Sequence, residues 1–151
     1  MVSFDPKDEN FEVRVRLSFA RQTAMATLGI ELLTLKAGEA ELKMPYDAAY
    51  AQQHGFLHAG IIATALDTAC GYAAFSLMPD DAAVLTVEFK INLVAPARGE
   101  CFLFRARVVK AGRTITVCDA HAFAVEDGKE KLIATMTGTL MALFDRKGIT
   151  H

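Results

Sequence analysis

The sequence predicts an α+β domain in which a curved antiparallel sheet of five to six strands wraps around one long central helix. Two observations lead to this prediction. One stretch of about twenty residues is apolar on nearly every side and must therefore be covered over most of its surface. The segments after it alternate between apolar and polar residues, the pattern of strands with one buried face. A sheet that curves around the helix provides the cover.

The N-terminal segment is expected to be a flexible tail followed by one helix. Residues 1–10 are acidic and polar and do not have the pattern of a signal peptide. Residues 11–28 carry apolar side chains at helical spacing, although part of the segment also alternates as a strand does. We expect the helix, because Asn10 is a suitable N-cap and Gly29 a suitable C-terminal stop.

Two strands and the long helix follow. The strands are expected at 30–36 and 39–44, joined by a short turn that contains glycine. The helix is expected from His58 to Met78, because the pyrrolidine ring of Pro79 prevents its continuation.

Four more strands are expected at 85–93, 100–110, 113–125 and 132–144, with an Asp-Gly pair marking the last hairpin. The first of these strands is expected to alternate regularly along its length. Its two faces would then carry Leu85, Val87, Phe89, Ile91 and Leu93 on one side and Thr86, Glu88, Lys90 and Asn92 on the other.

Bulk properties limit the class of protein. A chain of 151 residues is expected to form a single domain spanning 1–151. The net charge of −2 argues against nucleic-acid binding, which favours a basic face. The three cysteines lack metal-type spacing and fit a reducing, cytoplasmic location. A hydrophobic fraction of 52% suggests an oligomer interface, and no membrane span is expected because a charge lies in the middle of the apolar helix.

That charge is the most informative residue of the chain. Asp67 is the one formally charged side chain between Asp47 and Asp80, and it lies inside the predicted buried helix. An unpaired polar group in such a place costs about 2–7 kcal/mol. His58 lies nine residues upstream and Gln52 fifteen, with two glycines nearby.

These residues form one motif, Gln52-x-x-Gly55-x-Leu57-His58-Ala59-Gly60 followed by Asp67-Thr68-Ala69. The motif resembles that of the hotdog-fold acyl-CoA thioesterases of the phenylacetate-degradation (PaaI-like) family. That family has an Asn or Gln, a Gly, His-Gly-Gly, and an acidic residue nine positions after the histidine. Residues 85–100 resemble the family's next strand and turn, and residues 110–113 its hairpin, so the likeness covers nearly the whole chain. Ala59 stands where the family usually has Gly, and it keeps the backbone N–H that the family uses.

The resemblance implies a hotdog fold and a thioester hydrolase. Hydrolysis of a thioester needs a base or nucleophile, a positioned water and a donor for the developing oxyanion. Asp67 is the candidate base or nucleophile, and Gln52 the candidate for orienting the water. The free N–H groups of Ala59 and Gly60 at the helix start are candidates for polarising the carbonyl.

Two further residues have open roles. His58 is expected to hold the loop that leads into the helix rather than to exchange protons. Thr86 is expected to hydrogen-bond Asp67 or the water, with plain sheet packing as the alternative.

Helix geometry predicts that the site needs two chains. Nine residues at about 1.5 Å per residue place Asp67 roughly 13 Å from the N–H groups at the start of its own helix. Two antiparallel helices related by a two-fold axis bring the two groups together. We therefore expect a homodimer with composite sites, Asp67 coming from one protomer and Gln52 and Ala59 from the other. The resemblance implies the same composite sites. Whether two such dimers pair into a dimer of dimers is left open.

Neither a metal nor a bound cofactor is expected, because coenzyme A would enter as part of the substrate. Arg98, Lys110 and Arg113 are candidate contacts for its phosphates. Asp119 and His121 lie two apart on one strand, but no third ligand has suitable spacing for a metal site.

Two alternative functions remain. One is a hydratase or dehydratase of acyl thioesters on the same fold. The other is a non-catalytic module that binds acyl-CoA. The presence of both Gln52 and Asp67 argues against the second.

Overall fold

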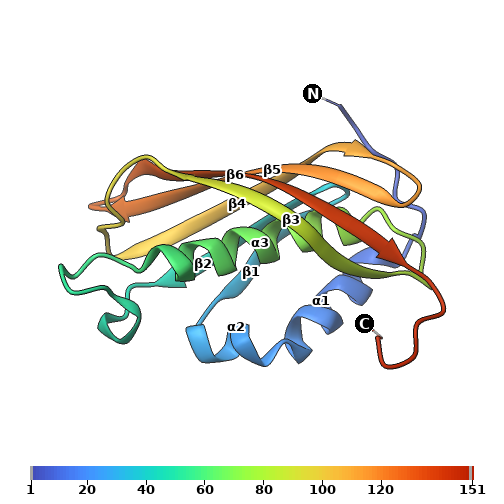
Figure 1. The fold of residues 1–151 in the computed structure, drawn as a ribbon, viewed down its shortest axis with the longest axis horizontal. Helices are drawn as coiled ribbons and strands as arrows, with labels where there is room; N and C mark the ends of the chain where they lie inside the picture. The colour runs from blue at the N-terminus through green and yellow to red at the C-terminus, as the bar shows by residue number, and fades with distance from the viewer. Residues whose placement is uncertain (1, 150) are drawn as a thin grey trace.

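A computed structural model describes residues 2–149 and 151 (Figure 1). In the part of the chain that it describes, two short helices and two strands come before the long helix, and four strands follow it. In chain order the elements are α1 (Phe11–Arg21), α2 (Thr23–Leu28), β1 (Glu31–Lys36), β2 (Glu39–Pro45), the 3-10 turn η1 (Ala48–Tyr50), α3 (Ala59–Phe75), β3 (Ala83–Leu93), β4 (Cys101–Ala111), β5 (Ile115–Glu126) and β6 (Lys129–Leu143).

The strands form one antiparallel six-stranded sheet in the order β1-β2-β4-β5-β6-β3. The helix α3 lies against one face of this sheet, and α1 and α2 lie on the far side of α3 (Figure 1). Alternate residues of the strands point toward α3 and are almost completely buried, as in β5 from Thr116 to Ala124. The expected fold, a sheet wrapped around one long helix, is confirmed.

The apolar helix is shorter at its C-terminal end than expected. It ends at Phe75 rather than Met78, because the backbone bonds of Leu77 and Met78 span three residues instead of four and side chains bind the carbonyls of its last turn. The hydroxyl of Ser76 donates to the carbonyl of Ala73, and Arg14 donates to the carbonyls of Phe75 and Met78. These bonds satisfy acceptors that a continuing helix would have used.

The N-terminal helix is two helices instead of one. The expectation of a single helix over 11–28 is wrong, because the chain breaks at Gln22, whose ψ of 94° is extended. On both sides of the break the backbone bonds span three residues instead of four, from Gln22 to Phe19 and from Met25 to Gln22. Gly29 ends α2 in the left-handed conformation, as expected, whereas the Asn10 side chain makes no capping bond.

Strand β3 does not alternate regularly, and the prediction that Leu85 to Leu93 share one face is wrong. A bulge between Thr86 and Glu88 inserts Val87 opposite a single position of β6. Thr86 pairs with Leu140, whose side chain is buried toward α3, so Thr86 also faces the helix. The bulge therefore turns Thr86 inward and Glu88 outward.

The remaining elements agree with expectation within a few residues. The Asp127-Gly128 hairpin is confirmed, and both residues have positive φ, 50° and 73°. Strand β6 begins at Lys129, three residues before the expected start, because the hairpin pairs its strands directly beside the turn. Among the described residues no helix combines the length and apolar character needed to cross a membrane.

One buried hydroxyl connects the β1–β2 turn to the end of α3. Ser76 is fully buried, and its Oγ accepts the N–H of Gly38 at 2.8 Å. The substitution Ser76→Ala leaves that N–H buried without an acceptor, and we expect it to lower the free energy of unfolding by about 1–3 kcal/mol. Urea denaturation measures the change. The matched variant Ser3→Ala, at an exposed position, should change stability by less than about 0.5 kcal/mol; equal stability of both variants would contradict the role of Ser76.

Candidate functional site

One side of α3 is left uncovered by the rest of the chain. The positions on this side are spaced three or four residues apart, which places them on a single helical face. We call them the open strip: Gly60, Ala63, Thr64, Asp67 and Gly71, all of them incompletely buried. Asp67 therefore faces away from the core that the sheet and helix form.

The Asp67 carboxylate has one hydrogen-bond partner within the described chain. Thr86 Oγ1 donates to Asp67 Oδ1 at 2.7 Å, the bond that the sequence led us to expect. Partial burial raises the pKa of Asp67 above its ordinary value, and the hydrogen bond from Thr86 acts in the opposite direction. The arrangement leaves Oδ2 without a partner among the residues described.

The start of α3 is organised by His58. Its Nδ1 accepts the N–H of Gly60 at 2.9 Å, so the imidazole is the N-cap of the helix. A Cβ on Gly60 would lie 3.2 Å from that nitrogen, so a larger residue would press on the capping imidazole. With Gly60 satisfied, the N–H of Ala59 is the first-turn donor that has no acceptor in the described structure.

The loop before α3 holds Gln52 in a fixed place. The N–H of Gln52 donates to the carbonyl of Phe56 at 2.8 Å, and the N–H of Gly55 donates to the carbonyl of Gln52 at 3.0 Å. The side-chain oxygen of Gln52 accepts the N–H of His54, and Gly55 adopts a φ of +82° that favours glycine. These bonds use the side-chain oxygen of Gln52, and the amide nitrogen has no hydrogen-bond partner among the described residues.

Gln52 and Ala59 line the same open groove, which has a volume of about 420 Å³. Its other walls are apolar and come from the loop before α3, from α3 itself and from the end of β3 and the loop after it: Phe56, Leu57, Ile62, Leu93, Val94, Ala95, Pro96 and Ala97. Leu93 and Val94 were not among the site residues predicted from the sequence. The sequence signal that could have found them is an apolar strand end that runs directly into a proline.

The structure thus brings the predicted residues together in two separate pairs. Asp67 lies beside Thr86, and Gln52 lies beside Ala59. Asp67 follows Ala59 by eight residues, about 12 Å along the helix axis, and does not line the groove. One chain therefore holds two half-sites rather than one complete site.

The candidate phosphate contacts are dispersed. Arg98 is exposed in the loop beside the groove. Lys110 and Arg113 are exposed at the β4–β5 turn, and Arg113 lies near Leu77 at the opposite end of α3. Only Arg98 is near Gln52 and Ala59 in the same chain.

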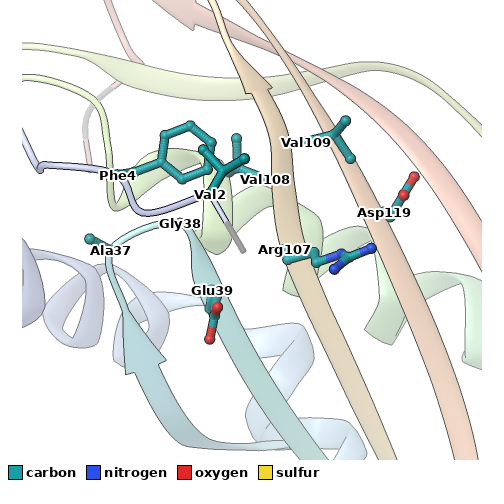
Figure 2. Close-up of a pocket in the computed structure, with 9 residues that line it drawn as sticks. All are labelled: Val2, Phe4, Ala37, Gly38, Glu39, Arg107, Val108, Val109 and Asp119. Atoms are coloured by element: carbon teal, nitrogen blue, oxygen red, sulfur yellow. The ribbon is translucent and has the colours of Figure 1, made fainter.

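Other polar groups lie elsewhere. Asp119 accepts a bond from Thr137, and His121 stacks on Phe123, both on the face of the sheet away from α3. Among the described residues no three His, Cys, Asp or Glu side chains form a metal-binding group. A hollow of about 450 Å³ lies between the N-terminal segment, the β1–β2 turn and strands β4 and β5; Asp119 lines it, but none of the residues expected to act in hydrolysis does (Figure 2).

Comparison with known proteins identifies the family. The sequence profile of the Thioesterase superfamily matches residues 54–131. A crystal structure of a thioesterase family protein from Silicibacter pomeroyi is 65% identical, covers 89% of this chain and 98% of its own, and superposes with a TM-score of 0.88.

Two more distant structures share the fold. A thioesterase from Haemophilus influenzae is 23% identical, covers 97% of this chain and 99% of its own, and has a TM-score of 0.81. The PaaI protein of the phenylacetic acid degradation operon of E. coli is 20% identical, covers 91% of this chain and 96% of its own, and has a TM-score of 0.80.

The fold and its matches thus define a hydrolase of the hotdog class. The chain belongs to the thioesterase superfamily, with a PaaI-like fold. The resemblance read from the Gln52–Asp67 motif is confirmed at this level.

The hydrogen bond between Thr86 and Asp67 leads to a prediction about the pKa of Asp67. The substitution Thr86→Val removes a donor that favours the ionised carboxylate, so the pKa of Asp67 should rise further above its ordinary value. Carbon-detected NMR titration of the aspartate carboxyl groups measures this pKa. Thr86→Ser keeps the hydroxyl and is the control, expected to titrate close to wild type. An unchanged pKa in Thr86→Val would show that the bond does not stabilise the anion.

Proposed function

We propose that this protein is an acyl-CoA thioesterase that works as a homodimer with two composite sites. In each site Asp67 of one protomer acts on a thioester whose carbonyl binds at Ala59 and Gln52 of the other. The observation that carries the proposal is the position of Asp67: a desolvated carboxylate on the open strip of α3, bonded by Thr86 and facing outward.

The chemistry follows from the groups at the two half-sites. Acting as a general base, Asp67 takes a proton from a water that Gln52 orients, and the hydroxide attacks the thioester carbonyl. Acting as a nucleophile, Asp67 attacks the carbonyl itself and water then cleaves the resulting anhydride. In both routes the oxyanion accepts the N–H of Ala59 at the positive end of the helix dipole. Collapse of the tetrahedral intermediate releases the coenzyme A thiolate.

Two features of the surface support the pairing of two chains. β3 lies at the edge of the sheet, and apolar residues along it, including Leu85, Val87, Phe89 and Leu93, are between 42% and 54% exposed. An exposed apolar edge strand tends to associate with another chain unless some other element covers it. The open strip beside it consists largely of small residues, so the backbones of two α3 helices can approach closely. A second copy related by a two-fold axis covers both features at once.

Further details complete the proposal. Coenzyme A takes part only as a portion of the substrate, and Arg98 is the cation best placed for its phosphates because it borders the groove. Three free cysteines are consistent with a cytoplasmic, reducing location. Pairing of two such dimers into a tetramer is compatible with this arrangement.

The first test removes the charge of Asp67. Asp67→Asn keeps the shape but takes away the base or nucleophile, so turnover of acyl-CoA should fall by about 10²–10⁴-fold in a free-thiol release assay. Because burial raises the pKa of this carboxyl above its ordinary value, the folded state loses stability when Asp67 ionises, and the amide avoids that cost. The melting temperature of the variant should therefore be no lower than that of wild type.

Asp119→Asn is the matched control, since Asp119 is also partly buried and bonded to a threonine but lies on the far face of the sheet. It should leave turnover unchanged. Turnover of Asp67→Asn close to wild type would refute the catalytic role of Asp67.

The second test addresses the composite site. Asp67→Ala and Gln52→Ala homodimers should each have little activity, because every site lacks one essential group. After random subunit exchange, half of the dimers are mixed, and each mixed dimer has one intact site of two, so roughly a quarter of wild-type activity should return. Native mass spectrometry of differently tagged subunits confirms exchange. Exchange without recovery would mean that each site is built from one chain.

A further inference from the structure

The two polar groups that line the groove, from Ala59 and Gln52, are held in different ways. Ala59 belongs to α3, so its N–H stays where the helix places it. Gln52 lies outside every helix and strand, in the loop between β2 and α3 that projects from the body of the molecule (Figure 1). We call residues 52–56 of this loop the Gln52 turn. The position of the Gln52 side chain therefore depends on what holds this turn.

The bonds inside the Gln52 turn do not attach its tip to the rest of the protein. The three that involve Gln52, with His54, Gly55 and Phe56, all close within the turn. Gly55 has a positive φ, and a Cβ placed on it would meet no atom within 4 Å, so nothing packs against that side of the turn. The tip can thus move as a unit without breaking any of these bonds.

Tyr46 holds the tip from outside the turn. Its hydroxyl donates to the carbonyl of Gly55 at 2.9 Å. Among the described residues this is the one hydrogen bond that joins residues 53–55 to a residue beyond the turn. Tyr46 directly follows β2, and its N–H donates to the carbonyl of Glu100 at 2.9 Å, just before β4 begins. The hydroxyl therefore connects the tip to the sheet.

Burial does not explain this bond. Tyr46 is 37% exposed and Gly55 is exposed, so the hydroxyl and the carbonyl can both bond water instead. Loss of one bond at an exposed site costs little global stability, but it allows an exposed turn to open locally. Catalysis is more sensitive, because a displacement of about 1 Å can lower a rate by about 100-fold. The bond from Tyr46 thus matters more for the place of Gln52 than for the fold.

We propose that Tyr46 is a positioning residue for thioester hydrolysis, because through Gly55 it holds the turn that places the Gln52 side chain in the groove. This inference rests on the proposed function, in which Gln52 orients the attacking water. The oxygen of the Gln52 side chain already accepts the N–H of His54, so its amide nitrogen is the donor for that water. Tyr46 does not line the groove and acts only through the turn.

The test is a double-mutant cycle on acyl-CoA hydrolysis. Tyr46→Phe removes only the hydroxyl, and we expect kcat to fall about three- to tenfold, the net effect of one hydrogen bond, while KM changes less than twofold. In Gln52→Ala protein the amide is already absent. Adding Tyr46→Phe there should change the remaining kcat, measured at raised enzyme concentration, by less than twofold. A hydroxyl that only stabilises the fold would lower kcat by the same factor in both backgrounds.

Tyr50→Phe is the matched control. The Tyr50 hydroxyl also donates to a main-chain carbonyl, that of Thr27 at 2.8 Å, but it joins the loop to α2 and does not contact the Gln52 turn. This variant should keep kcat within twofold of wild type. Wild-type kcat in Tyr46→Phe, or equal losses in the two backgrounds, would overturn the inference while leaving the thioesterase function intact. Wild-type protein that hydrolyses no acyl-CoA would instead refute the proposed function, and full turnover in Gln52→Ala would refute the role of Gln52.

Discussion

The covering of α3 determines the rest of the structure. This helix is apolar around nearly its whole circumference, so the fold is stable only if other elements remove it from water on most sides. The sheet covers one side, and α1 covers the C-terminal half through the contact between Phe19 and Tyr72. What remains is the open strip from Gly60 to Gly71. A polar side chain of α3 can reach water or a ligand only along this strip, and Asp67 lies on it.

The same constraint organises the start of the helix. The first N–H groups of a helix have no acceptor within it, and His58 satisfies one of them through Gly60. The cap leaves the neighbouring donor at Ala59 free beside an apolar groove. In the proposed reaction, a substrate carbonyl that enters the groove exchanges a water hydrogen bond for this amide in a drier environment, where the bond is electrostatically stronger. One helix cap therefore accounts for both the structural role of His58 and the free N–H on which the proposed role of Ala59 depends.

The helices and strands could be predicted from the sequence, but their local irregularities could not. Alternating side chains and the Asp127-Gly128 pair were sufficient for the strands and the last hairpin, because both are local signals. The bulge at Val87 was missed because an inserted apolar residue leaves the alternation of β3 unbroken in the sequence. The end of α3 and the break at Gln22 were also missed. The first depends on bonds from Ser76 and Arg14, which is distant in the chain, and the second on a local change to three-residue backbone bonds.

The bulge matters for the site because it decides which group Asp67 contacts. Without the bulge, Thr86 and Glu88 would share one face of β3, because residues two apart in a regular strand point the same way, so a Thr86 that points toward α3 would bring Glu88 there as well. A glutamate beside Asp67 would have raised the pKa of the aspartate by repulsion, whereas a threonine hydroxyl lowers it. In the proposed reaction a bound substrate removes more water from Asp67 and makes the anion a stronger base. The bond from Thr86 keeps that base ionised, so the bulge sets the balance between a carboxylate that is reactive and one that is protonated.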